Sequence, residues 1–433
     1  MTAAEDSPDF STPTQIEKLG VPVGMVEELF ARRLLIEKVS TIGALCQRIC
    51  ISQAIGQEIA ESLRSKKQIE YLGAEGRDYR LALTGDGERR TIEQMRNASY
   101  VVPVPVSLDD YRFAVESQDI KVALNREIIK SHLSDLVVRD ELIDQLGPAF
   151  LSKGAMLLYG PPGTGKTSLA ERVGRFAEDN ILIPRIVEAD SQLISIFDPA
   201  LHHPCEVQPP GLDPRWVVCK RPVIVVGGEL QLDALDLQHD EASGLHTAPI
   251  QMLANNGLLV VDDFGRQTAD PDQILNRWIL PLSTGVDYLR GRSGTKFTVP
   301  FRLKLVVSTN LEPTDLGDEA FLRRLQNKIY VGAMDEQGFA WSLARAADRL
   351  DLELTADGAT KVIEISRRFL GELRPYIAVD FCEMANCMLS YEAAPKVLTA
   401  DVVNRVAATY FVKSPDESPA ESGLSSSLVD SMV

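Results

Sequence analysis

The sequence predicts an α/β fold: a parallel sheet with flanking helices, preceded by a winged-helix-like domain and followed by a helical bundle. The glycine-rich stretch GPPGTGKT at residues 160–167 lies between a strand-like run, GAMLLYG, and a helical run, TSLAERVGRFAE. A loop of this kind between strand and helix is typical of phosphate-binding α/β proteins. A second apolar run, GLLVV, ends in two aspartates at 262 and 263. Helical apolar spacing on both sides of this core predicts the two further domains.

Residues 14–99 are predicted to form the winged-helix-like domain. Helical spacing covers 23–36, 41–49 and 52–68, and two strands separated by a turn follow at 69–73 and 78–84. The segments 1–13 and 413–433 are rich in serine, proline and acidic residues. Such segments cannot bury enough apolar surface to order themselves, so we expect two disordered tails.

The third helix of this domain indicates which kind of partner the domain binds. It carries Gln53, Gln57, Glu58 and Glu61 before the basic residues Arg64, Lys66 and Lys67. Acidic residues slightly outnumber basic ones over residues 1–100, so neutralisation of phosphates is weak. The charge pattern favours docking to a protein over reading of DNA, and a purely structural cap is the remaining interpretation.

Residues 100–120 are expected to be a linker. Prolines at alternating positions in YVVPVPVSLDDY hold the chain extended, because proline fixes its own φ and biases its predecessor away from helix. The nucleotide-binding α/β domain is then predicted over residues 121–335, with no internal repeat.

The glycine-rich loop predicts a bound nucleoside triphosphate. Backbone N–H groups of Gly163, Thr164 and Gly165 can wrap the β-phosphate, since glycine permits the tight turn and the close approach. Lys166 supplies the charge that reaches the β- and γ-phosphates, and Thr167 supplies a hydroxyl for Mg²⁺. The predicted cofactors are ATP and Mg²⁺, and the predicted nucleotide-binding residues are Gly160, Pro161, Pro162, Gly163, Thr164, Gly165, Lys166, Thr167 and Ser168.

The two aspartates after the second apolar run predict the rest of a metal-dependent hydrolytic site. Asp262 stands at the end of the strand expected over Leu258 to Val261, where it would hold Mg²⁺ through water together with Thr167. Asp263 would orient or deprotonate the attacking water. Two acidic residues could merely begin a turn, but the phosphate loop in the same chain favours the catalytic interpretation.

Two later segments carry further candidates. FRLKLVVSTN is a second apolar strand that ends in Asn310, and DEAFLRRLQNKIYV contains the pair Arg323 and Arg324. Helical spacing then continues through residues 336–412, with segments at 356–370, 375–391 and 399–411. Arg374 lies between the first two of these segments.

A long insertion is expected at about residues 199–250. We place the second strand of the sheet at residues 183–190, which leaves nearly seventy residues before the strand at 258–261. Within them, WVVCKR and PVIVVGGEL are interpreted as a hairpin. Long connections are commonly binding loops or pore loops, so this insertion is predicted to contact a partner, with Ile196 and Phe197 the nearest candidates for a pore loop.

The strand, loop and arginine segments together resemble the AAA+ ATPases. By that resemblance Asn310 is sensor 1, Arg323 and Arg324 are arginine fingers that reach the nucleotide of the next subunit, residues 336–412 are the lid, and Arg374 is sensor 2. DEAFLRRLQNKIYV is similar to the double-arginine segment of the katanin and spastin branch. VGGEL, DDFGRQ, LNRWILPL, VPFRLKLVVSTNLEP and DEAFLRRL resemble bacterial predicted ATPases with chaperone activity associated with Flp pilus assembly.

The resemblance implies an ATPase that works as a homo-oligomeric ring, with six subunits expected, and remodels or assembles proteins. The expected clients or adaptors dock on the winged-helix-like domain and on the 199–250 insertion. A DNA-linked loader or regulator is one alternative. The usual AAA+ motif ends in Asp-Glu, whereas this chain has Asp262 and Asp263. The shorter side chain leaves a second alternative open, a scaffold that binds ATP and turns it over slowly.

Composition narrows the classes of partner and location. Forty-five Lys and Arg residues against 62 Asp and Glu residues give a formal net charge of −17, which disfavours a general affinity for nucleic acid. No run reaches the length needed to cross a bilayer, so we expect a cytoplasmic protein without direct membrane insertion. Six scattered cysteines predict reduced thiols, and the spacing of His202, His203, Cys205 and Cys219 matches no standard zinc site.

Overall fold

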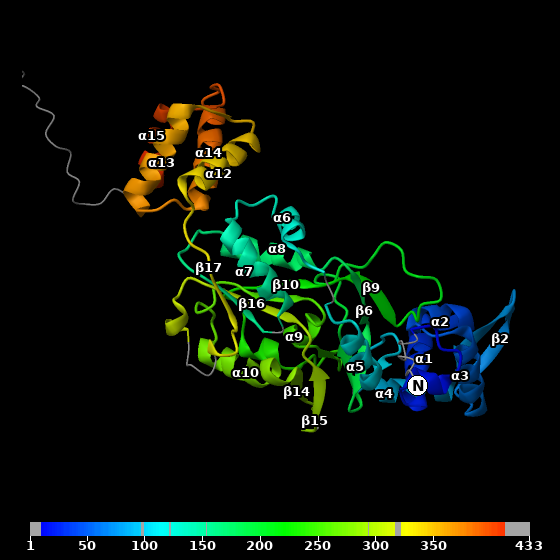
Figure 1. The fold of residues 1–433 in the computed structure, drawn as a ribbon. Helices are drawn as coiled ribbons and strands as arrows, with labels where there is room; N and C mark the ends of the chain where they lie inside the picture. The colour runs from blue at the N-terminus through cyan, green and yellow to red at the C-terminus, as the bar shows by residue number, and fades with distance from the viewer. Residues whose placement is uncertain are drawn as a thin grey trace, which may run out of the picture. The chain divides into compact units, whose positions relative to one another are not determined.

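A computed structural model describes residues 10–96, 99–120, 123–152, 154–292, 294–316 and 322–411 of the protein (Figure 1). The chain divides into two compact units. The first comprises Met1–Ser134, Asp140–Gly160 and Lys166–Val331, and the second comprises Asp135–Arg139, Pro161–Gly165 and Gly332–Val433. The middle of the phosphate loop therefore belongs with the C-terminal helices. Most of the two predicted tails lies outside the described residues.

The N-terminal part of the first unit packs helices on a small antiparallel sheet. Its elements are η1 Ile16–Leu19, α1 Val23–Glu37, β1 Val39–Thr41, α2 Ile42–Ile49, α3 Gln53–Ser65, β2 Ile69–Glu75, β3 Asp78–Leu83 and α4 Gly85–Met95. The strands are ordered β1-β3-β2. The side chains of Thr41 and Ser52 cap the N-termini of α2 and α3, which determines where these helices begin. The three expected helices and two expected strands are present, whereas β1 and α4 were not expected.

The predicted linker at residues 100–120 is instead part of the folded core. It forms β4 Val106–Ser107 and α5 Leu108–Ser117. The ring of Tyr111 is buried, and its hydroxyl accepts a hydrogen bond of 2.8 Å from the side-chain amide of Asn255. The alternating prolines extend only the first few residues, and Ser107 then caps a helix whose apolar face packs on the core.

A buried arginine fixes the N-terminal part to the core. Arg215 and Asp213 are each 3% exposed and pair at 2.7 Å. The Arg215 guanidinium also donates to the carbonyl of Leu19 at 2.9 Å and to that of Pro105 at 3.0 Å. One side chain thus joins the end of η1, the segment before β4 and the loop before β9 (Trp216–Lys220).

Loss of this arginine is expected to loosen the N-terminal part. Arg215→Ala leaves Asp213 charged and unpaired in the interior, a change that costs about 3–5 kcal/mol in other proteins. We expect a lower unfolding midpoint in urea and faster tryptic cleavage N-terminal to residue 106. Arg33→Ala serves as the control, because its ion pair with Glu37 in α1 is partly exposed and such pairs contribute little. Equal midpoints for the two variants would contradict the role given to Arg215.

A five-stranded parallel sheet forms the centre of the first unit, as predicted. Its order is β10-β13-β16-β5-β17, and its strands are β5 Met156–Tyr159, β10 Val223–Val226, β13 Leu258–Val261, β16 Lys304–Thr309 and β17 Asn327–Tyr330. The central strands β13 and β16 are buried along their whole length, as expected of parallel strands covered on both faces, whereas burial alternates along the edge strand β10 and the other edge strand, β17, is largely polar. In Figure 1, α6 Arg126–His132, α7 Asp140–Leu151 and α8 Lys166–Val173 lie above the sheet, and α9 Ile250–Leu253 and α10 Pro271–Thr284 lie below it.

The prediction for the second strand was wrong. Residues 186–189 form β7 (Ile186–Ala189) of a separate sheet, ordered β11-β12-β8-β7-β4. In the central sheet β13 lies between β16 and β10. Its pairing with β10 is parallel and begins with Val223 opposite Leu258. The expected hairpin of WVVCKR and PVIVV is therefore absent: β9 pairs with β6 (Asn180–Pro184), and β10 enters the central sheet. Only Arg221 and Pro222 separate these strands, a spacing that favoured the hairpin.

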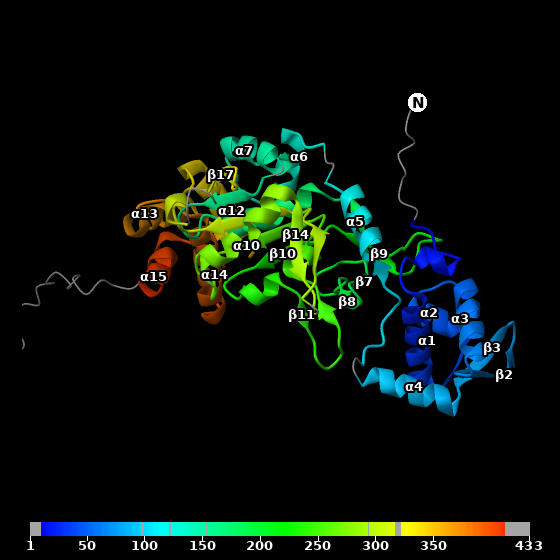
Figure 2. The same cartoon turned by 90° about the horizontal axis from the view of Figure 1, so that it is seen from below.

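This assignment also revises the predicted insertion at about 199–250. The segment is not one loop, because it contains a strand of the central sheet. Within this segment β9 precedes that strand, and η3 Leu232–Leu235, β11 Gln238–His239 and β12 His246–Thr247 follow it. β11 and β12 join β8 (Gln192–Ser195), β7 and β4 in the smaller sheet. Figure 2 shows a further hairpin, β14 Val286–Arg290 with β15 Lys296–Pro300, beside α10. The short 3-10 helices η2 Gly174–Phe176 and η4 Pro313–Asp315 complete the first unit.

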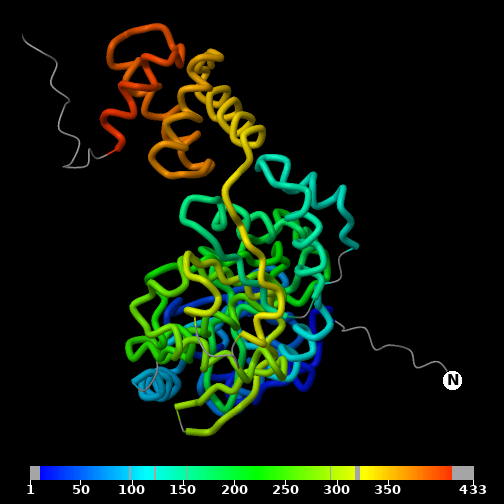
Figure 3. Tube along the Cα trace, turned by 60° about the vertical axis from the view of Figure 1, so that its left-hand side comes forward, coloured from blue at the N-terminus to red at the C-terminus, as the bar shows by residue number. Residues whose placement is uncertain are grey.

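The second unit is a four-helix bundle with a short parallel strand pair. Its elements are α12 Glu336–Asp348, β18 Glu353–Leu354, α13 Ala356–Leu370, α14 Pro375–Tyr391, β19 Val397–Leu398 and α15 Ala400–Tyr410. The helices pack side by side (Figure 3) around buried residues that include Phe339, Phe381 and Val403. The last three helices match the expected segments closely. Among the described residues, none of the helices is both long enough and apolar enough to cross a membrane.

Candidate active site

The phosphate loop connects β5 to α8. Three of its glycines adopt positive φ angles, +139° at Gly160, +76° at Gly163 and +90° at Gly165. At Gly160 a side chain is also excluded by space, because a Cβ atom would lie 2.5 Å from the carbonyl oxygen of Val331. The hydroxyl of Thr164 donates to the carbonyl of Pro161 at 3.0 Å within the loop. Glycine is thus required where the sequence places it.

Lys166 points across the sheet edge to the next strand. Its ammonium group is buried and donates to the carbonyl of Gly160 at 2.9 Å and to the side-chain oxygen of Asn310 at 2.8 Å. Asn310 immediately follows β16, and its amide donates at 3.0 Å to the carboxylate of Asp263. One chain of hydrogen bonds therefore connects the loop lysine, the residue after β16 and the second aspartate.

A second chain of hydrogen bonds passes through Asp262. The hydroxyl of Thr167 donates to one carboxylate oxygen at 2.8 Å, and the hydroxyl of Ser308 donates to the other. Thr167 lies in the first turn of α8, Asp262 follows β13 and Ser308 belongs to β16. Because the carboxyl ends of parallel strands meet at one edge of the sheet, three separate segments place these oxygens together.

The oxygens of Thr167 and Asp262 suit Mg²⁺. This ion prefers oxygen ligands and commonly keeps several waters while binding one or two protein carboxylates and substrate phosphates. The hydroxyl and the carboxylate lie within hydrogen-bond distance of each other beside the loop, so one ion could contact both. The predicted metal ligands are brought together by the fold.

Asp263 lies in the turn that follows β13. Its φ is +48°, a region in which aspartate and asparagine occur more often than other non-glycine residues. The side-chain amide of Gln267 donates to the carbonyls of Asp262 at 3.0 Å and Asp263 at 3.3 Å. The side-chain oxygen of Gln267 accepts from the N–H of Gly265 at 2.8 Å. Gln267 thus braces the turn that carries both acids.

Ser308 and Gln267 contact the two aspartates, and the sequence reasoning missed both. Ser308 is a small hydroxyl residue inside the apolar run KLVVST, two residues before Asn310, and this interruption was the available signal. Gln267 has no comparable signal, because a glutamine four residues after an acidic pair is common in loops. Ser168, predicted to contact nucleotide, follows Thr167 on α8 and is half-buried.

The arginine pair lies in the segment between β16 and β17. Arg323 is exposed, and the Nε of Arg324 donates to the hydroxyl of Ser283 at 2.9 Å, at the end of α10. The first four residues of the segment DEAFLRRLQNKIYV lie outside the described part of the chain.

Arg374 and loop residues Pro161–Gly165 belong to the same unit. Arg374 is the N-cap residue of α14, and its guanidinium donates to the carbonyl of Pro162 at 3.3 Å. Its Nε also donates to the carboxylate of Glu372 at 2.6 Å. The carbonyl contact brings this predicted residue to the phosphate loop.

Other candidates from the sequence do not form sites. Both ring nitrogens of His202 are engaged, one with the N–H of Asp198 and one with the carbonyl of Leu253, and burial lowers its pKa. Among the described residues, no group of three or more potential ligands could hold a metal ion. Ile196 is buried in the core, and Phe197 stacks on His202, so neither is exposed as a pore-loop residue would be.

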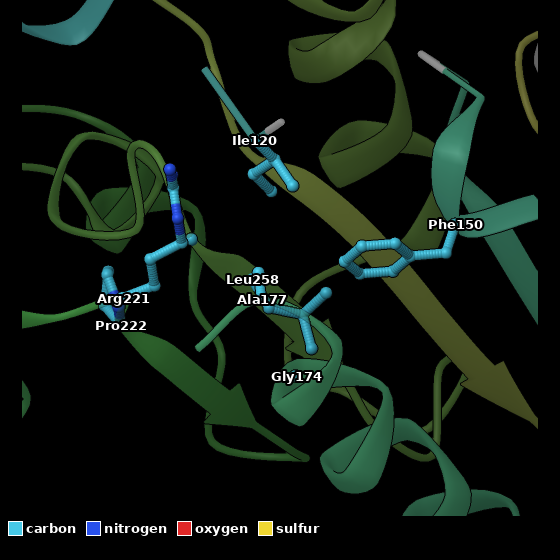
Figure 4. A pocket seen from close by; sticks show the side chains of 8 residues that line it. Ile120, Phe150, Gly174, Ala177, Arg221, Pro222 and Leu258 are labelled. Atoms are coloured by element: carbon cyan, nitrogen blue, oxygen red, sulfur yellow. The ribbon is translucent and has the colours of Figure 1, made fainter. Parts of the chain in front are cut away.

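A small apolar cavity lies at the other end of the sheet (Figure 4). It is lined by Ile120, Phe150, Gly174, Ala177, Arg221, Pro222, Gly257 and Leu258. The last four precede or begin β10 and β13, whereas Asp262 follows β13. The Arg221 guanidinium pairs with Asp179 at 2.6 Å and donates to backbone carbonyls. The cavity is therefore separate from the loop and has no polar group turned to a ligand.

Residues 156–201 match the family model described as the ATPase family associated with various cellular activities (AAA). The match begins at β5 and includes the whole phosphate loop and α8. No curated protein matches the chain. Together with the loop geometry, the family match supports an AAA+ P-loop core with ATPase activity.

Solved structures with a similar arrangement share little sequence with this chain. A variant of RuvB from Thermotoga maritima is 15% identical, with 70% of this chain and 72% of that chain covered at a TM-score of 0.39. The RuvB Holliday junction branch migration motor of the same organism is 16% identical over 70% and 72%, with a TM-score of 0.36. NtrX from Brucella abortus in complex with ATP is 11% identical over 73% and 60%, with a TM-score of 0.38. Similarity at this level says nothing about substrate or partner.

Proposed function

We propose that this protein hydrolyses Mg·ATP at sites shared between the subunits of a homo-oligomeric ring and uses the energy to remodel or assemble proteins. The observation that carries the proposal is the pair of hydrogen-bond chains at one sheet edge, Lys166–Asn310–Asp263 and Thr167–Asp262–Ser308. Together the two chains contain a lysine, hydroxyl groups, two carboxylates and an amide, which are the groups that phosphoryl transfer to water needs.

Each group has a proposed role. Backbone N–H groups of Gly163 to Thr167 and the ammonium of Lys166 bind the phosphates, and Thr167 and Asp262 hold Mg²⁺. The ion, when bound, neutralises charge that develops on the transferred phosphoryl group. Asp263 orients and deprotonates the attacking water, while Asn310 holds the Asp263 carboxylate in place. Arg374 positions the loop through Pro162.

The proposal assigns the arginines to the neighbouring subunit. Arg323 is exposed, and the Nε of Arg324 donates to the hydroxyl of Ser283 at the end of α10. A planar guanidinium presented by one subunit to the next nucleotide would stabilise the transition state and make the ring necessary for turnover. We expect six subunits, by analogy with the ATPases whose double-arginine segment resembles the one in this chain.

Charge supports a protein client over nucleic acid. The outer face of α3 exposes Gln57, Glu58 and Glu61, and Lys66 beside them is paired with Glu27 at 2.6 Å. With a net charge of −17 over the whole chain, binding to a polyanion is weak unless a local basic surface dominates. Salt-dependent DNA binding together with stimulation of ATPase activity by DNA would instead support the loader or regulator class.

The proposal predicts that Lys166→Ala removes nucleotide binding. The variant loses the only charge that the loop itself directs at the phosphates, so we expect the Kd for a fluorescent ATP analogue to rise by about 10²-fold or more. Lys361→Ala is the control, since Lys361 pairs with Glu364 on the surface of α13. Chelation of Mg²⁺ is expected to stop hydrolysis by the natural chain. Unchanged binding in Lys166→Ala would refute the proposed site.

A further inference from the structure

A tyrosine at the start of α14 packs directly on the phosphate loop. Tyr376 and Gly163 belong to the same compact unit. A Cβ atom at Gly163 would lie 2.1 Å from Cδ1 and 2.6 Å from Cε1 of the Tyr376 ring. No side chain fits at such distances, so the ring lies against the bare backbone of Gly163. The positive φ of Gly163 is one reason for glycine at this position, and the contact with the ring is a second.

The same turn of α14 holds the neighbouring loop residue. Arg374, two positions before Tyr376, donates to the carbonyl of Pro162 at 3.3 Å and is itself fixed by Glu372. The loop residues 162 and 163 are thus held by a hydrogen bond and by an aromatic ring from one short segment. Pro375 between them is the first residue of α14 and restricts the backbone of that segment.

The far side of the Tyr376 ring is anchored in the helical bundle. Tyr376 is half-buried and packs against the apolar core of the second unit. Burial raises the pKa of Tyr410, and the neighbouring Asp380 carboxylate and Tyr376 side chain add to this effect. Tyr410 therefore stays protonated and donates to Asp380. This chain of contacts connects the ring on the loop with both α14 and α15.

We propose that Tyr376 is a positioning residue for the nucleotide, whose ring braces Gly163 so that the loop N–H groups stay directed at the β-phosphate. The role rests on the proposed function of the loop. The β-phosphate is bound in the ground state and in the transition state alike. Loss of the brace should therefore raise KM and leave kcat nearly unchanged, which is the signature of uniform binding. The ring is the essential part, and the hydroxyl serves only the link to Tyr410.

Titration of the full-length chain with a fluorescent ADP analogue tests this proposal. We expect Tyr376→Ala to weaken binding about tenfold and to raise KM for ATP to a similar extent, with kcat within about twofold of the natural chain. Tyr376→Phe keeps the ring and should bind within about twofold of the natural chain. Tyr391→Ala is the matched control, because Tyr391 ends the same helix and is 93% exposed.

The design separates bracing from folding and from the proposed function. If Tyr376→Ala fails to fold, Tyr376→Leu retains apolar bulk without the flat ring and is expected to show the same loss of affinity. Natural affinity in Tyr376→Ala or Tyr376→Leu overturns the inference, as does a loss of affinity in Tyr391→Ala that equals theirs. Lys166→Ala is titrated in parallel. If Lys166→Ala binds normally, the proposed function fails, and if only the Tyr376 variants bind normally, the inference alone fails.

Discussion

Asp263→Asn is expected to bind ATP with the affinity of the natural chain and to hydrolyse it about 10²- to 10⁴-fold more slowly, the range usual for loss of a general base. The carboxylate at 263 contacts Asn310 and takes no part in the loop itself. Lys166, Thr167 and Asp262 remain in place for the nucleotide and the ion. Nucleotide affinity and the rate of single-turnover hydrolysis, measured on the same variant, would show separately that binding is retained and that hydrolysis is slowed.

The substitution preserves the backbone of the turn. Asparagine adopts positive φ about as readily as aspartate, so the +48° at position 263 is retained. Asp351→Asn is the matched control: Asp351 is exposed, lies in the second unit and has a φ of +51°. A normal rate in Asp263→Asn would leave the slow-turnover scaffold as the better account, because the second aspartate would then have no catalytic role.

Arg324→Ala is expected to lower the rate of ATP hydrolysis by about 10³-fold or more, within the range measured for arginine fingers. The affinity of the chain for nucleotide should change little, since the proposal places Arg324, whose Nε donates to Ser283 at the end of α10, at the nucleotide of the neighbouring subunit. Arg323→Ala should have an effect in the same direction. Steady-state hydrolysis at protein concentrations that allow assembly is the measurement.

The control for the arginine variants is Arg349→Ala, at the exposed C-terminal end of α12. Ser283→Ala removes the hydroxyl that orients Arg324 without removing the charge, so its rate should fall between those of the natural chain and Arg324→Ala. If Arg324→Ala hydrolyses ATP at the normal rate while monomeric, the arginine pair is a surface feature and the intersubunit site is wrong.

The sequence predicted the parts of the site that lie in local motifs. The phosphate loop, Asp262, Asp263 and Asn310 each follow or precede an apolar strand, and parallel pairing brings the ends of such strands together. Their hydrogen bonds through Lys166 and Thr167 follow from that placement. The bundle at 336–412 was equally predictable, because helical apolar spacing is strong over long segments.

The errors concern pairing between strands distant in the chain. The run at 223–226 pairs with β13 and not with its neighbour β9, which only Pro222 and Arg221 separate. Nothing local decides between a hairpin and a strand that joins another sheet, because both need short apolar runs. α5 was missed for a related reason: the prolines before it dominated the pattern, and the packing of Tyr111 on Asn255 is a tertiary contact.

Tyr376 shows the same limit at the site itself. Its role depends on the contact between the start of α14 and Gly163. No spacing of residues in the sequence predicts that contact. Gly163 was explained from the sequence by loop conformation alone, whereas the structure adds a ring that occupies the space of a side chain. Residues that act by packing on a motif are found only when the fold is known.

The intersubunit site is tested most directly by mixing two inactive variants. Lys166→Ala lacks a working loop but retains Arg324, and Arg324→Ala lacks the finger but retains Lys166. If the site is shared, an equimolar mixture should regain hydrolysis at about a quarter of its interfaces, those that join an intact loop to an intact arginine. Each variant alone should remain inactive. A mixture no more active than the sum of its two components would contradict the shared site.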